Sequence, residues 1–318
     1  MVEKRGGFTM KKLMLFSLAL LLLTALYACR GEDFENQVIN VYTRDTTSGT
    51  RDGFMKGIGF DEAAGSDDVL VDGFVTNNNT GIMTAMTTDV SGIGYISLYS
   101  VNNTIKGLSF NGIEPTVENV MNNTYGLKRP FVFMHRNLDD FRNENEKALT
   151  MAFVDFVLSQ EGADVINDNG AVATNSLGVW SNIRSNHEIC QQNNAEFTLS
   201  FGGSDSVSRI AEALSAAFSP NCGNVQTVNN HTGSGDGWRR SQGDQKDGVN
   251  YVHIGYSSRF FRGQELETDS TGESRYQIAW DAIVAIVHID NPIDGLSADQ
   301  LVRIYRGDLK TWGDVIND

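Results

Sequence analysis

Segments typical of strands alternate with segments typical of helices along most of the chain. Apolar alternation and short apolar runs favour strands, whereas apolar residues three or four positions apart favour helices. This alternation predicts an α/β fold with mostly parallel sheets. The expected strands are VINVYT (38–43), IGYISLY (93–99), FTLSFGG (197–203), YVHIGYSS (251–258) and AIVAIVHI (282–289), and the expected helices are 148–168, 206–218 and 297–307.

The length of 318 residues is too great for one small core and suits two lobes of ordinary size. The net charge of −15 argues against a nucleic-acid-binding surface, because binding to a phosphate backbone requires clustered lysine and arginine. Such a cluster occurs only within the first twelve residues. We therefore expect a globular protein with no nucleic-acid partner.

The N-terminal residues have the pattern of an export signal. Basic residues precede an apolar stretch from Leu13 to Leu26, which is shorter than a membrane span of about 20 residues but fits a signal peptide. The sequence LYAC then ends at Cys29 and looks like the lipobox of a bacterial lipoprotein. We expect 1–29 to be a lipoprotein signal with Cys29 acylated, 30–37 to be a polar tether, and the exported protein to be held at the cell envelope by its lipid alone. The alternative is an ordinary signal peptide with a chance cysteine.

Two further cysteines, Cys190 and Cys222, remain if Cys29 carries the lipid. Exported proteins commonly pair their cysteines. The sequence does not show that these two lie close in space, but we predict a disulfide between them.

Two similar turns follow strand-like segments. TRDTTSGTRDGF (43–54) and NNHTGSGDGWRR (229–240) both contain Ser-Gly, and both can begin a helix. The first turn of a helix offers free backbone N–H groups and the positive end of the helix dipole, and a serine adds a hydroxyl donor. Each turn alone could be a simple helix cap, but two of them with an arginine favour the binding of a small oxyanion.

Two other turns carry the same kinds of residues. Ser204, Asp205 and Ser206 lie between a strand and an amphipathic helix, where Asp205 or Ser206 could instead cap the helix. Ser258 and Arg259 follow another strand, where the alternative is a surface turn with a solvated arginine.

The sequence gives no support for an enzyme. It contains no G-x-S-x-G, P-loop or H-E-x-x-H run, and its five histidines never fall at metal-ligand spacing. We therefore expect no catalytic residue, no metal and no cofactor.

Taken together, these segments resemble the phosphate-binding proteins of bacterial ABC phosphate importers, which belong to the periplasmic-binding-protein superfamily. The resemblance implies a two-lobe periplasmic-binding-protein fold of type II-like topology that closes on its ligand. It covers nearly everything after residue 37 and rests on INVYTRDTTSGTRDGF, GIGYISL, GLSFNGIEPTVENVMNNTYGLKRPFVF, FVDFVLSQEGADVINDNGAV, LSFGGSDSVSRIAEALSAAF, GSGDG, HIGYSSRFFRGQEL and IAWDAIVAIVHIDNPIDGLSADQLVRIYRGDLKTWGDV.

The order of the segments is rotated relative to the family, which predicts a circular permutation with its break between Asp318 and Val38. The alternative is an artefact that joined fragments of two genes. A permutation requires chain ends that lie close together. It gives lobe II from 38–114 plus 294–318 and lobe I from 115–293.

The resemblance also implies the ligand-binding residues. Arg44 would supply a charge-assisted contact, and the other donors are hydroxyls and backbone N–H groups. The expected set is Arg44, Ser48, Gly49 and Thr50 from lobe II, with Ser206, Val207, Ser234, Gly235, Asp236, Ser258, Arg259 and Asp281 from the rest of the chain.

One departure concerns selectivity. Many family members have an acidic residue where this chain has Ser258, and that acid accepts the phosphate proton and repels sulfate. Asp236 or Asp281 could replace it, although Asp236 could cap a helix and Asp281 could be a structural contact between lobes. We expect a monomer that binds inorganic phosphate for the permease of an ABC importer. The alternatives are a sulfate-like oxyanion, or a surface sensor or adhesion lipoprotein without transport.

Overall fold

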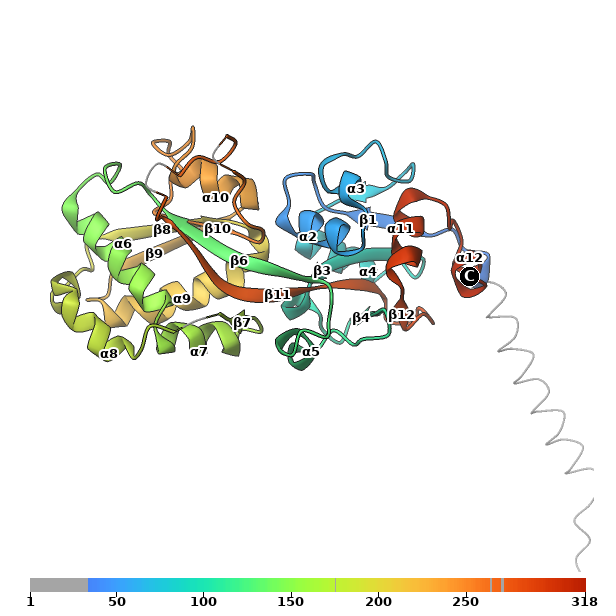
Figure 1. Ribbon diagram of the computed structural model, residues 1–318, viewed down its shortest axis with the longest axis horizontal. Coiled ribbons are helices and arrows are strands. Elements are labelled where there is room, and N and C mark those ends of the chain that lie inside the picture. Colours follow the sequence, from blue (N-terminus) through green and yellow to red (C-terminus); the bar gives the residue numbers. More distant parts are fainter. Residues whose placement is uncertain (1–33, 175, 264, 270–271) are drawn as a thin grey trace, which may run out of the picture.

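The computed structural model describes residues 34–174, 176–263, 265–269 and 272–318. The signal region with Cys29 lies outside them. The described chain forms two α/β bodies side by side, joined by two long strands (Figure 1). Within these ranges no helix has the length and apolar character needed to cross a bilayer.

Each body has its own hydrophobic core, and we name the bodies by these cores. The core of lobe II contains Phe34, Phe54, Tyr95, Tyr305 and Trp312 among others, so both ends of the described chain contribute to it. Its elements are β1 (Asn40–Thr43), α2 (Gly49–Gly57), α3 (Asp61–Gly65), β2 (Val75–Thr76), α4 (Asn79–Met86), β3 (Gly92–Ser97), β4 (Ile105–Gly107), β5 (Ser109–Phe110), α5 (Val117–Met121), β12 (Gly295–Leu296), α11 (Ala298–Arg306) and α12 (Trp312–Ile316).

Lobe I is built from the middle of the chain around a second core that includes Phe153, Phe201 and Phe218. The predicted helix over 148–168 is two helices, because Ser159 caps the second by accepting a hydrogen bond from Gly162 N. The elements of lobe I are α6 (Glu144–Val157), α7 (Gln160–Asp168), β7 (Val172–Ala173), α8 (Trp180–Ile183), β8 (Thr198–Gly203), α9 (Ser208–Asn221), β9 (Gln226–His231), α10 (Ser234–Ser241) and β10 (Ile254–Ser257).

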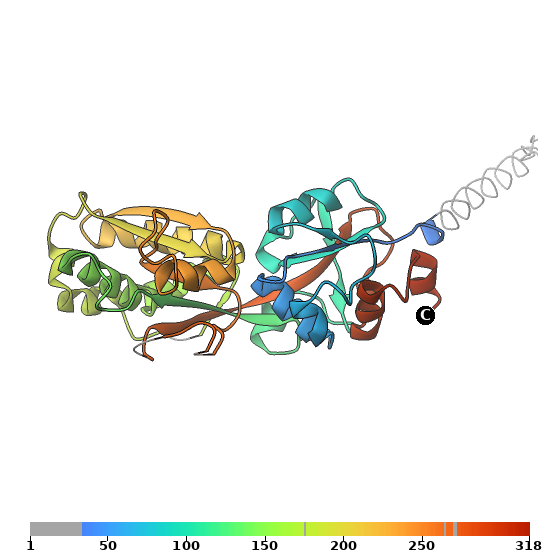
Figure 2. The same cartoon turned by 90° about the horizontal axis from the view of Figure 1, so that it is seen from above.

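Strands β6 (Lys128–His135) and β11 (Arg275–His288) cross between the lobes, as both views show (Figures 1 and 2). The main sheet has the order β2-β1-β3-β11-β6-β10-β8-β9. Strands β9, β8 and β10 pair in parallel, as do β2, β1 and β3. The prediction of parallel strands therefore holds within each lobe, whereas β6 and β11 pair antiparallel with each other and with their neighbours.

The position of these two strands bears on the expected lobe boundaries. Tyr125, Leu127, Ile283 and Val287 belong to the core of lobe II. We therefore propose that the chain crosses between lobes within β6 and β11, rather than near residues 114 and 293.

The two ends of the described chain meet in lobe II. Val38 forms an antiparallel bridge with Thr311, and the N–H of Trp312 donates to Gln37 O at 3.1 Å. The ring of Phe34 stacks on Trp312 with centroids 5.7 Å apart. Residues 34–37, predicted as part of the tether, are thus packed against lobe II. This proximity is what a circular permutation requires.

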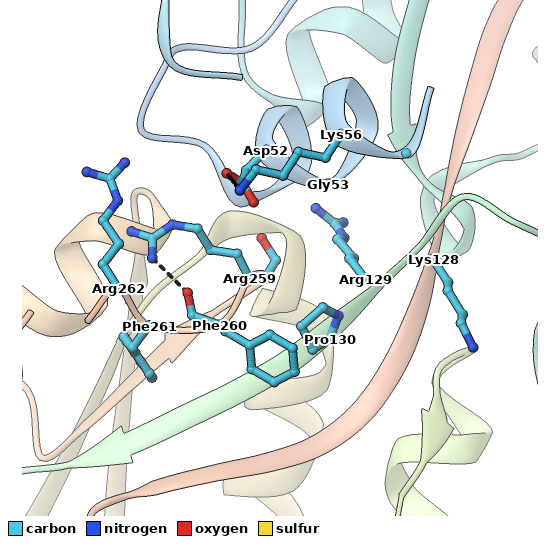
Figure 3. A pocket seen from close by; sticks show the side chains of 12 residues that line it. Asp52, Gly53, Lys56, Lys128, Arg129, Pro130, Arg259, Phe260, Phe261 and Arg262 are labelled. Atoms are coloured by element: carbon cyan, nitrogen blue, oxygen red, sulfur yellow. Dashed lines mark hydrogen bonds and ion pairs between the residues drawn. The ribbon is translucent and has the colours of Figure 1, made fainter. Parts of the chain in front are cut away.

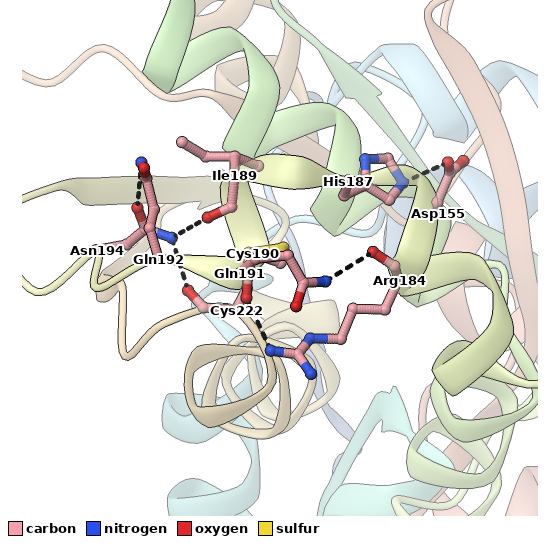
Figure 4. Close-up of a disulfide and its surroundings, with 9 residues drawn as sticks. All are labelled: Asp155, Arg184, His187, Ile189, Cys190, Gln191, Gln192, Asn194 and Cys222. Atoms are coloured by element: carbon pink, nitrogen blue, oxygen red, sulfur yellow. Dashed lines mark hydrogen bonds and ion pairs between the residues drawn. A yellow bond between two sulfur atoms is a disulfide. The ribbon is translucent and has the colours of Figure 1, made fainter.

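Cys190 and Cys222 form a disulfide with their Cα atoms 4.1 Å apart (Figure 4). It joins the 3₁₀ turn Glu188–Gln191 to the end of α9. The Asn194 amide donates to Ile189 O at 2.7 Å and to Cys222 O at 3.1 Å, bridging the two sides of this link.

Candidate anion-binding site

Both Ser-Gly turns begin helices at the boundary between the lobes. Ser48 caps α2, and its hydroxyl accepts hydrogen bonds from Thr50 N at 3.2 Å and Arg51 N at 3.5 Å. Helix α10 begins at Ser234. The N–H groups in the first turn of a helix have no partner within the helix. The two turns therefore supply backbone donors from both lobes.

A cluster of buried hydroxyls lies between these turns. Ser258 accepts from Ser204 at 2.9 Å and lies 3.2 Å from the Ser234 hydroxyl, all three within lobe I. Thr50 of lobe II lies 2.9 Å from the Ser206 hydroxyl of lobe I. We name Thr50, Ser204, Ser206, Ser234 and Ser258 the hydroxyl cluster. Its members follow the ends of β8 and β10 or lie at the starts of α2 and α10 and in the 3₁₀ turn Asp205–Val207.

The closeness of the lobes explains the glycine in the first turn. A Cβ atom at Gly49 would lie 2.4 Å from the Ser258 hydroxyl and 2.7 Å from that of Ser234. Such distances are shorter than any normal contact, so only glycine fits there. Gly235, in contrast, has nothing within 4 Å of the equivalent position, and Val207 is buried in the 3₁₀ turn Asp205–Val207.

An ion pair crosses the lobes beside this cluster. The Arg44 guanidinium donates through Nη2 to both carboxylate oxygens of Asp205, at 2.9 and 2.8 Å, and through Nη1 to the Thr50 hydroxyl at 3.1 Å. Burial by itself would raise the pKa of Asp205, but the charge and hydrogen bonds of Arg44, with the Asn79 N–H and the charge of Arg129, outweigh burial and hold that pKa below its ordinary value. Asp205 is therefore an ionised partner of Arg44.

Asp205 is not the helix cap that the sequence suggested. Ser204 takes that place, because its hydroxyl accepts from Ser206 N at 3.3 Å. Sequence reasoning missed the role of Asp205 because a carboxylate in the first turn normally indicates a cap. The only available signal was its position within a segment already expected to bind the ligand.

A second ion pair lies deeper, on the crossing strands. Arg129 at the start of β6 donates through Nε and Nη2 to one oxygen of Asp281, at 3.0 and 2.8 Å, and also donates to the Thr50 hydroxyl. Ser97 donates to the same Asp281 oxygen at 2.7 Å. Burial raises the pKa of Asp281, opposed by Arg129 and Ser97. Asp281 thus has the structural contact that was one of its two expected roles, and Arg129 is a residue that the sequence analysis missed.

Asp236 and Arg259 point to other partners. Asp236 accepts from the Thr232 hydroxyl and from Arg239, so it neither caps α10 nor belongs to the hydroxyl cluster. Arg259 is buried against Glu267, with N–O distances of 2.6 and 3.1 Å. Arg259, which we expected to contact the ligand, thus has its guanidinium held by Glu267, and it is not the solvated arginine of the alternative.

Several buried polar atoms at this place have no hydrogen-bond partner among the described residues. They include Arg44 Nε, Asp281 Oδ1, the Tyr256 hydroxyl and His231 Nδ1. Burial lowers the pKa of His231 to about 4, so its ring is neutral at physiological pH. Buried polar groups are normally satisfied, so each exception requires an explanation, of which an absent ion or water is one.

The chemistry of the site is that of an oxyanion receptor. Hydroxyls, first-turn N–H groups and two guanidinium groups are donors, and together they can replace the water around a small tetrahedral anion. Among the described residues, no group of histidine, cysteine and acidic side chains could hold a metal ion.

The comparisons with known proteins agree with this geometry. Residues 190–318 match the family model described as PBP superfamily domain. This part of the chain is similar to that domain. Over 284 residues it is 27% identical to the phosphate-binding protein PstS 2 of Streptococcus agalactiae serotype V, covering 87% of each chain. PstS 2 of Streptococcus pneumoniae serotype 4 is 27% identical over 280 residues, covering 86% of each chain.

A solved structure extends the likeness from the sequence to the fold. The crystal structure of a phosphate-binding protein of a phosphate ABC transporter from Streptococcus pneumoniae TIGR4 matches with a TM-score of 0.61 and 26% identity. The match covers 88% of this chain and 100% of that one. The predicted resemblance and fold class are confirmed. The rotated order of the segments is not tested and stays a prediction.

Proposed function

We propose that this chain is an extracytoplasmic solute-binding lipoprotein that captures inorganic phosphate between its two lobes for an ABC importer. The observation that carries the proposal is the pair of contacts across the lobes, Thr50 to Ser206 and Arg44 to Asp205. Both join predicted ligand-binding segments that are far apart in the sequence. The names of the relatives support phosphate as the ligand.

The roles follow from the chemistry of the donors. Ser48, Gly49 and Thr50 would bind the anion from lobe II, and Ser206, Val207, Ser234, Gly235 and Ser258 from lobe I, while Arg44 adds a charge-assisted contact through its unsatisfied Nε. Binding from both lobes would favour the closed arrangement. The relatives are named as binding proteins and not as enzymes, in agreement with the expectation that this chain is not an enzyme.

Asp205 is the acidic side chain that we propose for selectivity, in place of Asp236 or Asp281. It contacts Arg44 beside the hydroxyl cluster, it is ionised, and its side chain retains 23% exposure. A carboxylate can accept a hydrogen bond from the P–OH group of monohydrogen phosphate, and it repels sulfate, which has no proton to donate. Sulfate is the alternative ligand because Ser258 is neutral.

Calorimetric titration of purified residues 30–318 tests the proposal. We expect tight binding of phosphate, at least tenfold weaker binding of sulfate, and no hydrolysis of a chromogenic phosphoester. Equal affinities would reject phosphate selectivity, and the absence of binding to both anions would reject the function.

The cellular part of the proposal needs its own experiment. The full chain should appear in the membrane fraction and incorporate labelled lipid, and a Cys29→Ala chain should do neither. The full chain should also co-purify with permease subunits. Binding of phosphate without a permease would favour the sensor or adhesion lipoprotein.

A further inference from the structure

A cavity of about 580 Å³ opens between the lobes next to the hydroxyl cluster. Its walls come from α2, from the start of β6 and from residues 258–262 after β10 (Figure 3). We name it the outer pocket. Apart from Ser258, its lining is charged or apolar: Asp52, Gly53, Lys56, Gly57, Lys128, Arg129, Pro130, Arg259, Phe260, Phe261 and Arg262.

The charge of the outer pocket is opposite to that of the whole protein. Five of its lining side chains are cationic and one is acidic, in a chain of net charge −15. Arg129 and Arg259 are neutralised by buried carboxylates, and Lys128 turns toward the Trp280 ring, its Nζ 4.8 Å from the ring centroid. The positive charge offered to solvent therefore comes from the exposed Arg262 and, in part, from Lys56, whose side chain is 56% exposed and pairs with Asp52 at 2.8 Å.

The outer pocket shares two residues with the inner site. Arg129 lines it and donates to the Thr50 hydroxyl, and Ser258 lines it and belongs to the hydroxyl cluster. Helix α2 packs tightly against this wall, since a Cβ at Gly53 would lie 3.3 Å from Arg129 Cβ. The buried side chains of Arg129 and Ser258 thus form the wall between an anion in the outer pocket and the hydroxyl cluster.

The electrostatic field of the whole protein repels anions, so local cations at the cleft would help an anion to approach. A net negative charge slows the approach of an anion, but charges farther than about 8–10 Å are screened at physiological salt. Cationic side chains at the mouth of a cleft then dominate the last part of the approach and can raise association rates by about 10- to 1000-fold.

We propose that the outer pocket is a second, weaker anion site that receives a phosphate ion before it reaches the hydroxyl cluster. The inference rests on the proposed function. The pocket adds charge but few fixed hydrogen-bond donors, so it raises the rate of capture and adds little to the final affinity.

The test compares two double variants with the same change in net charge. Lys56→Gln/Arg262→Gln removes one exposed cation of each lobe at the pocket. The control, Lys147→Gln/Lys310→Gln, removes one from each lobe in α6 and just before α12, at opposite ends of the molecule in Figure 1. Stopped-flow mixing with inorganic phosphate, followed by tryptophan fluorescence, gives association and dissociation rate constants at low and high salt.

At low salt we expect the association rate constant of the pocket variant to fall by about tenfold relative to the control, with an unchanged dissociation rate constant. The difference should shrink at 0.5 M salt, where the screening length is only about 4 Å. Equal association rates in the two variants would overturn the outer pocket while leaving the proposed function intact. If the unaltered protein binds no phosphate, both proposals fall. Single Lys56→Glu provides the same readout if the double variant folds poorly.

Discussion

Two Arg–Asp pairs reach the hydroxyl of Thr50, and they differ in what they join. Arg129 and Asp281 lie on the crossing strands β6 and β11, at most 1% exposed. Arg44 and Asp205 come from different lobes, and the carboxylate remains 23% exposed. The first pair is part of the connection between the lobes, whereas the second can form only when the lobes are together.

The electrostatics of the two aspartates differ accordingly. Burial is the largest influence on both carboxyl groups: it raises the pKa of Asp281, whereas at Asp205 the charge and hydrogen bonds of Arg44, with the Asn79 N–H and Arg129, together outweigh burial and lower the pKa. The same residue types therefore serve two purposes: a fixed support for the site and a contact that responds to closure.

The largest expected effect is on the deep pair. Asp281→Ala leaves the Arg129 charge buried without its partner, which should reduce the free energy of unfolding by about 3–5 kcal/mol. Urea denaturation followed by circular dichroism measures this loss. Asp205→Ala is the matched change in the other pair and should cost clearly less; equal losses would abolish the distinction between the two pairs.

Replacing Arg44 should have an intermediate effect, which is a loss of affinity for phosphate. Arg44→Gln removes the charge that meets the anion, which should weaken phosphate binding by about 1.5–3 kcal/mol, roughly 10- to 150-fold. Calorimetry gives the change directly. Arg259→Gln is the control, because its guanidinium is held by Glu267 away from the hydroxyl cluster. A larger loss at Arg259 than at Arg44 would contradict the site.

The smallest effect is the pH dependence of the cross-lobe pair. Because the pKa of Asp205 is lowered in the folded protein, the stabilisation from this contact is complete above the ordinary carboxyl pKa of about 4 and is lost as pH falls through the lowered value. We expect this contact to contribute about 1 kcal/mol to the free energy of unfolding. Between pH 6 and pH 2 the free energy of unfolding of the ligand-free protein should therefore fall more in the parent than in Asp205→Asn. Parallel plots of this free energy against pH would refute the contact.

Much of the fold could be predicted from local patterns. The helix over 297–307 has a serine cap, a spaced apolar face and a terminal glycine, and the structure has α11 with a capping box at Ser297 and Gly307 at φ 88°. The break at Ser159 was harder to predict, because apolar spacing continues on both sides of it. The direction of β6 and β11 could not be predicted, since it depends on long-range pairing.

The site residues likewise divide into those that local patterns predict and those that depend on long-range contacts. Residues at strand ends and helix starts were found because a Ser-Gly turn exposes N–H groups locally, and the structure brings Gly49, Ser234 and Ser258 into contact. Arg129 and Asp205 act through partners 79 and 161 residues away, which no local pattern encodes. Asp236 carried a suitable motif but has neighbours that occupy its carboxylate.

The packing of Phe34 against Trp312 limits how far lobe II can lie from a membrane that holds the proposed lipid anchor. With lipid on Cys29, as proposed, only residues 30–33 would separate the acyl chains from a buried side chain. The chain from Cys29 to Phe34 can span at most about 18 Å when fully extended. Lobe II would then stay close to the bilayer. Closure on the ligand would therefore be a movement of lobe I relative to an anchored lobe II.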